Sequence, residues 1–341
     1  MMMINNMGGW ARRAAAGMAA VLALGLLSAC GGGTEQITPF EPRRLLVLGD
    51  EMSVLTPAPL PGRKYSTNAL SSDDTALDCV ARQIWHQVVA YQFNFSYAEC
   101  NPKGVTDNAA RIYAAPGAKT EDLIAQLERA LVENGPFSNT DLFTVLVGAN
   151  DVLDLYERVY LADPTADTAS AINAVLQERG VALGRFINKL TRADVGDVNG
   201  PKLIVSTIPL MNLTPYAIKE AALRPTANVR SVLLGFSNTF NTAMRVTIVN
   251  DGRFIGLVEL DGILNAAVTN PGNYGLVNVT QAVCAVEMPD CTVSGTDPTQ
   301  GTLVPNGNAN TWLWASDLWI GSTAQLRLGN FARGRALGNP F

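Results

Sequence analysis

The stretch LLVLGDEMS at residues 45–53 decides the fold class, because it joins a short apolar run to a glycine-containing turn. Four consecutive apolar residues, Leu45 to Leu48, are typical of a strand that is buried on both faces of a parallel sheet. Gly49 and Asp50 end this run, and polar residues follow within the next few positions. We therefore expect a central strand whose carboxyl end opens into a loop.

Similar apolar runs recur along the chain and alternate with segments of helical spacing. The predicted strands are residues 45–48, 111–115, 142–147, 203–207 and 254–258. The predicted helices are residues 79–91, 120–133, 169–190 and 228–249, with Thr120 as a helix N-cap. Strands that alternate with helices imply right-handed crossovers, so the pattern predicts a doubly wound α/β sandwich. Residues 54–78 and about 270–310 are rich in turn-forming residues and are expected to be excursions from this core.

Four short blocks are expected at the carboxyl edge of the sheet, where open parallel sheets bind their ligands. The first two are GDEMS at residues 49–53 and APGA at residues 115–118. The third is GAND at residues 148–151, directly after an apolar run. The fourth is WLWASDLWI at residues 312–320, close to the C-terminus. Because each block follows a different part of the core, we expect the four blocks to meet in one site.

The blocks, in this order, resemble those of the SGNH/GDSL hydrolases over residues 43–337. In that family they read Gly-Asp-Ser-Leu-Ser, a glycine, Gly-x-Asn-Asp and Asp-x-x-His. The resemblance implies a three-layer α/β/α sandwich with a five-stranded parallel, flavodoxin-like sheet, and an ancestry in the hydrolysis of ester bonds. It places Glu51 at the position of the nucleophilic serine, Asp317 at that of the triad acid and Ile320 at that of the histidine.

These two substitutions remove the chemistry of a serine esterase. A serine hydroxyl becomes a nucleophile only when an adjacent base takes its proton, and the triad acid acts by orienting that base. By the same resemblance, Gly117 and Asn150 supply oxyanion-hole donors, together with the backbone N–H at position 51. We expect the Glu51 carboxylate either to turn into this hole or to cap the following helix.

Five further side chains have two interpretations each. Ser53 is either an alternative nucleophile or a structural residue, since it matches the second serine of the family motif, which is not the family's nucleophile. His86 is either an alternative base or a packing or surface residue, which is typical of a lone histidine in a helical pattern. Trp312, Trp314 and Trp319 either line a groove for a sugar or a lipid or pack the edge of the core.

Three functions are compatible with this sequence. The first is a non-catalytic esterase homologue that binds an ester, a lipid or a glycan. The second is an active hydrolase, either an ester hydrolase with an unorthodox nucleophile or a glycoside hydrolase that uses Glu51 and Asp317 as a carboxylate pair. The third is a structural envelope protein without a ligand. We expect no cofactor and no metal, because the chain has one histidine and no CxxC spacing.

The N-terminal segment has the pattern of a bacterial export signal. Arg12 and Arg13 precede a small-apolar run at residues 14–27, and LSAC at residues 27–30 resembles a lipobox. The pattern predicts a signal peptide over residues 1–29, a lipidated Cys30, a flexible tether over residues 30–41 and a single domain over residues 42–341. Glycine rather than aspartate after Cys30 indicates an outer-membrane lipoprotein, held to the membrane by its lipid.

The net charge indicates which classes of partner the chain can bind, and the cysteine content indicates the compartment in which it folds. The net charge of the whole chain is −5. Residues 1–29 carry two arginines and no acidic residue, so the net charge of the mature chain is lower by two, at −7. Such an acidic chain excludes nucleic acid as a partner. The four cysteines after Cys30 are an even number in an exported chain, which indicates two disulfides. Of three possible pairings, the local one is favoured, Cys79 with Cys100 and Cys284 with Cys291.

Overall fold

The computed structural model describes residues 39–338, so the predicted signal peptide, Cys30 and most of the predicted tether lie outside the described residues. The central feature of the described part is a five-stranded sheet. Its strands are β1 (Arg44–Gly49), β4 (Ala110–Ile112), β5 (Asp141–Leu146), β6 (Lys202–Ser206) and β7 (Ile255–Val258). They are ordered β4-β1-β5-β6-β7, and every neighbouring pair is parallel. All five predicted apolar runs fall on these strands, and the flavodoxin-like order is confirmed.

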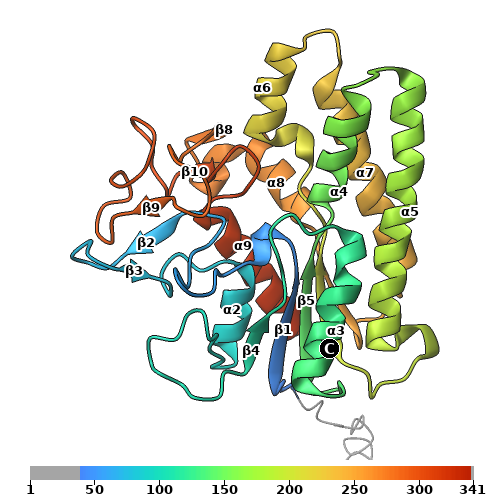
Figure 1. Ribbon diagram of the computed structural model, residues 1–341, viewed down its shortest axis with the longest axis vertical. Coiled ribbons are helices and arrows are strands. Elements are labelled where there is room, and N and C mark those ends of the chain that lie inside the picture. Colours follow the sequence, from blue (N-terminus) through green and yellow to red (C-terminus); the bar gives the residue numbers. More distant parts are fainter. Residues whose placement is uncertain (1–38, 339–341) are drawn as a thin grey trace, which may run out of the picture. The chain divides into compact units, whose positions relative to one another are not determined.

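Helices cover both faces of this sheet and make it the middle of three layers (Figure 1). One face carries α2 (Trp85–Gln92) and α9 (Ser322–Ala336). The other carries α3 (Leu123–Asn134), α5 (Ala166–Thr191) and α7 (Val229–Thr247). Right-handed crossovers explain this division, because the chain moves to one side from β1 to β4 and to the other side afterwards. The predicted α/β/α sandwich is therefore confirmed.

Three further helices stand at or beside the carboxyl ends of the strands. They are α4 (Ala149–Leu155), which continues as a π-helical turn over Tyr156–Tyr160, α6 (Pro215–Leu223) and α8 (Leu260–Thr269). The strand residues 45–48 are fully buried, as a strand covered on both faces should be. Within residues 39–338, no helix combines the length and the apolar character needed to cross a membrane.

The two excursions pair in one small sheet, and a second small sheet lies on the same side of the molecule's described part (Figure 1). The strand β2 (Asn68–Leu70) pairs with β3 (Leu77–Asp78) and, in parallel, with β9 (Thr292–Val293). The second sheet pairs β8 (Asn278–Ala282) with β10 (Trp312–Trp314). Segments that are distant in the sequence thus form one wall beside the carboxyl edge of the main sheet.

Two disulfides close loops next to these excursions. Cys79 pairs with Cys100 at a Cα–Cα distance of 5.7 Å, and Cys284 pairs with Cys291 at 5.8 Å. This is the local pairing that the sequence favoured. Each bridge restricts the unfolded chain, and so each stabilises a segment that has little regular structure of its own.

Two local predictions are wrong. The helix predicted from residue 79 begins only at Trp85. Before it, the Asp78 carboxylate accepts hydrogen bonds from two backbone N–H groups, and Arg82 has a left-handed φ of 48°, so this segment is a turn. Thr120 is not an N-cap: Lys119 holds the N-cap position of the 3-10 turn η2 (Thr120–Asp122), where its backbone N–H donates to the Asp122 carboxylate, and α3 follows this turn.

Candidate functional site

The first block turns sharply at the end of β1. Gly49 has a φ of 134°, and a Cβ there would lie 2.0 Å from the Leu146 carbonyl oxygen, so only glycine fits. The Gln126 side chain of α3 holds Gly49 through both its N–H and its carbonyl, at 2.8 and 2.9 Å. Asp50 then caps the 3-10 turn η1 (Glu51–Ser53) by accepting from the Met52 N–H at 3.1 Å.

Glu51, the first residue of this turn, has both carboxylate oxygens occupied. Its Oε1 accepts from the Gly117 N–H at 2.6 Å, and its Oε2 accepts from the Asn150 side-chain amide at 2.8 Å. Only 8% of the residue's surface is exposed. The carboxylate therefore fills the space between the two donors that the sequence assigned to an oxyanion hole, and it does not cap a helix.

The third block supplies Asn150 from the first turn of α4. Gly148 before it has a φ of 123°, and a Cβ there would lie 2.3 Å from the Phe240 ring, so this turn also requires glycine. The Asn150 amide donates to the Ala118 carbonyl at 3.1 Å as well as to Glu51. Asn150 thus joins the first and second blocks.

Asp151, the next residue of α4, connects this helix to the loop after Gly117 and to α5. One of its oxygens accepts from the Thr120 backbone N–H at 2.9 Å and from the Thr120 hydroxyl at 3.2 Å, and the other accepts from Arg179 at 2.9 Å. Burial raises the pKa of this carboxyl, while the partners from Thr120 and Arg179 lower it. The role of Asp151 is to fix the loop that carries Gly117.

Asp50 is the most deeply buried acid of the site. Its Oδ1 bonds with Met52, but its Oδ2 is buried without a hydrogen-bond partner among the described residues. Burial raises the pKa of Asp50 well above its usual value, and the neighbouring Glu51 charge raises it further. Burial and the adjacent Glu51 therefore both favour the neutral form of the Asp50 carboxyl.

Asp317 is not paired with a base. Both of its carboxylate oxygens bond with the Lys219 ammonium of α6, at 2.7 and 2.8 Å. The Asp317 side chain is 38% exposed, so the ion pair lies at the surface and is partly screened.

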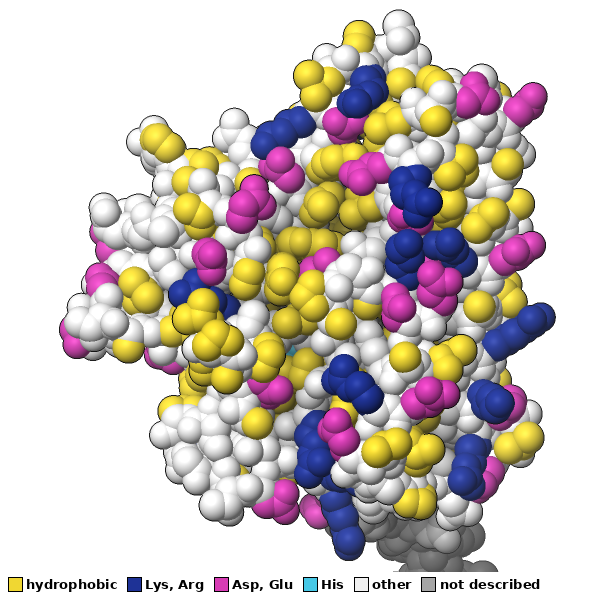
Figure 2. Space-filling view, in the orientation of Figure 1, with side chains coloured by type: hydrophobic (Ala, Val, Ile, Leu, Met, Phe, Trp, Pro, Cys, Tyr) yellow, Lys and Arg dark blue, Asp and Glu magenta, His cyan; other side chains and the backbone are white. Residues whose placement is uncertain are grey.

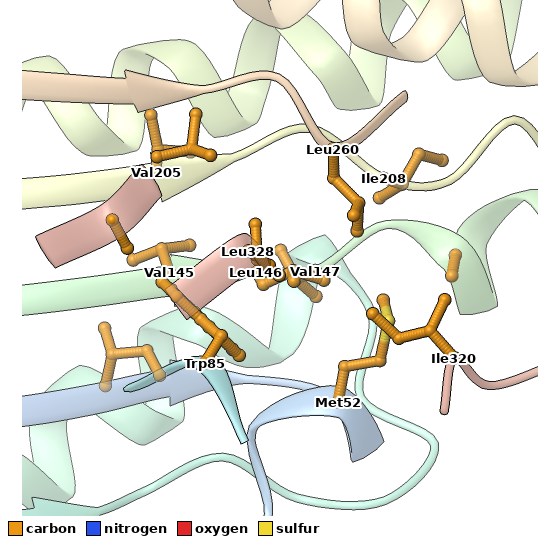
Figure 3. Close-up of a cluster of buried hydrophobic side chains, with 14 of the residues drawn as sticks. Met52, Trp85, Val145, Leu146, Val147, Val205, Ile208, Leu260, Ile320 and Leu328 are labelled. Carbon is orange, nitrogen blue, oxygen red and sulfur yellow. The ribbon is translucent and has the colours of Figure 1, made fainter. Parts of the chain in front are cut away.

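Ile320, at the expected histidine position, is completely buried. Figure 3 shows its side chain and that of Met52 pointing toward one another in an apolar cluster. Its carbonyl accepts from the Ser66 hydroxyl at 3.0 Å. The structure thus places position 320 next to the first block, but an aliphatic side chain fills the space where the histidine was expected.

A groove of about 910 Å³ opens beside these residues, between α6 and the excursions. Figure 2 shows a hollow lined by hydrophobic side chains in this region. We call it the side groove, and define it by Tyr65, Ile218, Met288, Trp312, Leu318 and Trp319, with Lys219 and Asp317 among its other lining residues. Trp314 is fully buried and donates to the Val279 carbonyl at 3.0 Å, so it packs the core.

Comparison with known proteins gives likeness of structure but not of sequence. No protein-family model and no curated protein sequence matches the chain. An acetylxylan esterase from Geobacillus stearothermophilus is similar at 12% identity and a TM-score of 0.43, over 88% of this chain and 97% of that one. A G-D-S-L family member from Veillonella parvula is similar at 10% identity and 0.38, over 85% and 95%. A phospholipase A1 from Streptomyces albidoflavus is similar at 12% identity and 0.46, over 87% and 100%.

The sheet order and the meeting of the first three blocks at its carboxyl edge decide the architecture. The chain has a flavodoxin-like α/β/α fold, arranged as the resemblance of its blocks to the SGNH/GDSL hydrolases implies. Within that fold, the fourth block reaches the first through the apolar contact of Ile320 with Met52 (Figure 3), while its Asp317 bonds with Lys219.

The two candidates for an alternative nucleophile and base are both buried and both engaged. The Ser53 hydroxyl accepts from the Trp85 indole N–H at 3.1 Å. His86 bonds through both ring nitrogens, with the Tyr97 hydroxyl at 2.6 Å and the Ser53 carbonyl at 3.1 Å. Burial lowers the pKa of His86 to about 3, so the ring is neutral at physiological pH. His86 is therefore a packing residue.

Sequence reasoning missed two residues of the site. Tyr65 lies in the first excursion and lines the side groove, and its pKa is raised by burial and then by the Glu51 and Asp290 charges. Lys219 lies on α6, a helix that the sequence did not predict. Neither residue belongs to a recognisable motif, so only the folded chain reveals them. Within residues 39–338, no three side chains of the metal-binding types gather in a possible metal site.

Proposed function

We propose that this protein is a non-catalytic SGNH/GDSL-fold protein of the cell envelope, which binds a ligand instead of hydrolysing an ester. One observation carries the proposal: the Glu51 carboxylate bonds with Gly117 and Asn150. An ester oxyanion in the same place would lose both donors. It would also face a negative charge, and two like charges about 4 Å apart repel by about 4 kcal/mol at an effective dielectric constant of 20.

The absence of a base supports the same proposal. His86 is the chain's single histidine, and both of its nitrogens are used in the core. Asp317, which would orient a base at position 320, is neutralised by Lys219. General-base activation of a hydroxyl needs a group with an accessible lone pair within hydrogen-bond reach, and neither residue offers one.

The two other functions have less support. A carboxylate pair needs two acids that face an open cleft, whereas Glu51 is buried in two hydrogen bonds and Asp317 is ion-paired. A purely structural role leaves the open side groove without a purpose. Attachment to the outer membrane through a lipid on Cys30 remains part of the proposal, on the sequence pattern alone.

The test is hydrolysis of short- and medium-chain p-nitrophenyl esters by the purified protein. We expect no turnover by the wild type, and none by Glu51→Ser, because that variant has a hydroxyl but no base. The double variant Glu51→Ser with Ile320→His restores both groups and is the only one expected to gain activity. Ester turnover by the wild type that disappears in Glu51→Ala would contradict the proposal and make the carboxylate the catalyst.

A further inference from the structure

We propose that the side groove binds a neutral oligosaccharide chain; this inference rests on the non-catalytic function proposed above and names its ligand. The groove's volume of about 910 Å³ lies within the range of small-molecule sites, roughly 300 to 1,000 Å³. It is separate from the space that Glu51 fills, because neither Gly117 nor Asn150 lines it. Binding there requires no change at Glu51.

One wall of the groove suits the apolar faces of sugar rings. Ile218, Met288 and Leu318 are each partly exposed in it, and Trp312 and Trp319 contribute their remaining exposed edges. A pyranose ring presents a face of C–H groups, which packs against aliphatic and aromatic side chains. Such a wall gives affinity without a charge.

The same lining carries uncharged hydrogen-bonding groups. Thr280 and Gln281 of β8 are exposed and line the groove, on the strand that pairs with β10. Ser316 accepts from the Leu318 and Trp319 backbone N–H groups, at 3.3 and 3.0 Å, so its hydroxyl proton remains to be donated. Donors and acceptors beside apolar side chains match a sugar, which has hydroxyls along its edge and C–H groups on its face.

The charges of the groove disfavour an anionic ligand. Lys219 is neutralised by Asp317, and Glu287 adds an uncompensated negative charge to the lining. The whole chain carries a net charge of −5. A fatty-acid carboxylate or a phosphate would meet no free cation in this groove, whereas a neutral glycan meets no electrostatic barrier.

The experiment titrates three β-1,4-linked hexasaccharides, of glucose, of xylose and of N-acetylglucosamine, into the purified protein by calorimetry and tryptophan fluorescence. We expect at least one to bind. Val286→Asp, which puts a charge on the groove wall, should weaken that binding about tenfold or more. Val277→Asp is the matched control, because Val277 is 81% exposed and lies outside the groove. It should bind as the wild type does.

Three results would overturn the inference. They are the absence of binding by all three hexasaccharides at millimolar concentration, equal effects of Val286→Asp and Val277→Asp, and saturable binding of laurate that Val286→Asp abolishes. The last result would assign the groove to an acyl chain. The ester assay keeps this outcome distinguishable, because a protein that binds no glycan and hydrolyses no ester loses only the glycan assignment. Ester turnover by the wild type would contradict the non-catalytic function itself.

Discussion

The Asn150 side-chain amide donates to the Glu51 carboxylate at 2.8 Å, across 99 residues of sequence. The second carboxylate oxygen accepts a hydrogen bond from the Gly117 N–H at 2.6 Å, so N–H donors from two loops converge on one side chain. The resemblance to the SGNH/GDSL hydrolases implies that these donors stand where a transition-state charge would develop. The Glu51 carboxylate occupies that place, and its two hydrogen bonds contribute to folding stability.

Glu51→Gln is expected to be no more stable than Glu51→Ala. Both partners of Glu51 are N–H donors, and a glutamine can present an acceptor to only one of them, while its own NH₂ group faces the other. Each variant should lose about 1–2 kcal/mol of unfolding free energy, measured by urea denaturation at pH 7. Glu128→Gln is the matched control, because Glu128 is exposed on α3. A Glu51→Gln variant as stable as the wild type would show that one of the two bonds contributes nothing.

Acetate is expected to stabilise Glu51→Ala and not the wild type. Truncation at Cβ removes a CH₂ group and a carboxylate, and acetate has the size and charge of that lost fragment. Binding to the folded state alone raises stability by RT ln(1 + [L]/Kd), which is about 1.4 kcal/mol at ten times Kd. The measurement is the melting temperature in sodium acetate against sodium chloride of equal ionic strength. Equal shifts in both salts would mean that the emptied site does not bind a carboxylate.

The fold was predictable because its signals are local. Each core strand is a continuous apolar run, and the glycines at positions 49 and 148 occupy turns that a Cβ would block. The meeting of Glu51, Gly117 and Asn150 follows from strand order once the parallel sheet is assumed, since loops after adjacent strands lie side by side. Sequence and structure agree where the information lies within a few residues or in a repeating pattern.

The remaining features depend on contacts between distant segments. Strand β2 is three residues long and pairs with β9 through Asn68 and Thr292. Because both strands are so short, neither has a hydrophobic periodicity that could predict it from the sequence. Asp317 pairs with Lys219, 98 residues away in the sequence, whereas the motif predicted that Asp317 would orient a catalytic base. Helix α2 starts late because its first predicted turn is held by Asp78, a capping interaction that competes with helix formation.

Asp50→Asn is expected to gain stability relative to the wild type as the pH rises. Because the pKa of Asp50 is higher in the folded state, its stabilising contribution is complete below the unfolded pKa of about 3.9 and is lost as the pH rises toward the folded pKa. Asparagine does not titrate and keeps the acceptor for the Met52 N–H. Urea unfolding between pH 4 and pH 8 measures the difference. A wild type that gains on the variant as the pH rises would mean that Asp50 is a stabilised carboxylate.

Tyr65 is expected to titrate above the ordinary pKa of a tyrosine, and Glu51→Ala should lower its pKa without normalising it. Burial is the larger cause of the shift and persists in the variant, while the Glu51 charge is the second cause and disappears. Absorbance titration near 295 nm, with Tyr65→Phe as the reference, isolates this phenol. Asp290→Asn is the matched control, because the Asp290 charge also raises the pKa but ranks below that of Glu51. A larger effect of Asp290→Asn would mean that the Glu51 charge is not the stronger influence on the pKa of Tyr65. The side groove would then be electrostatically independent of the Glu51 carboxylate.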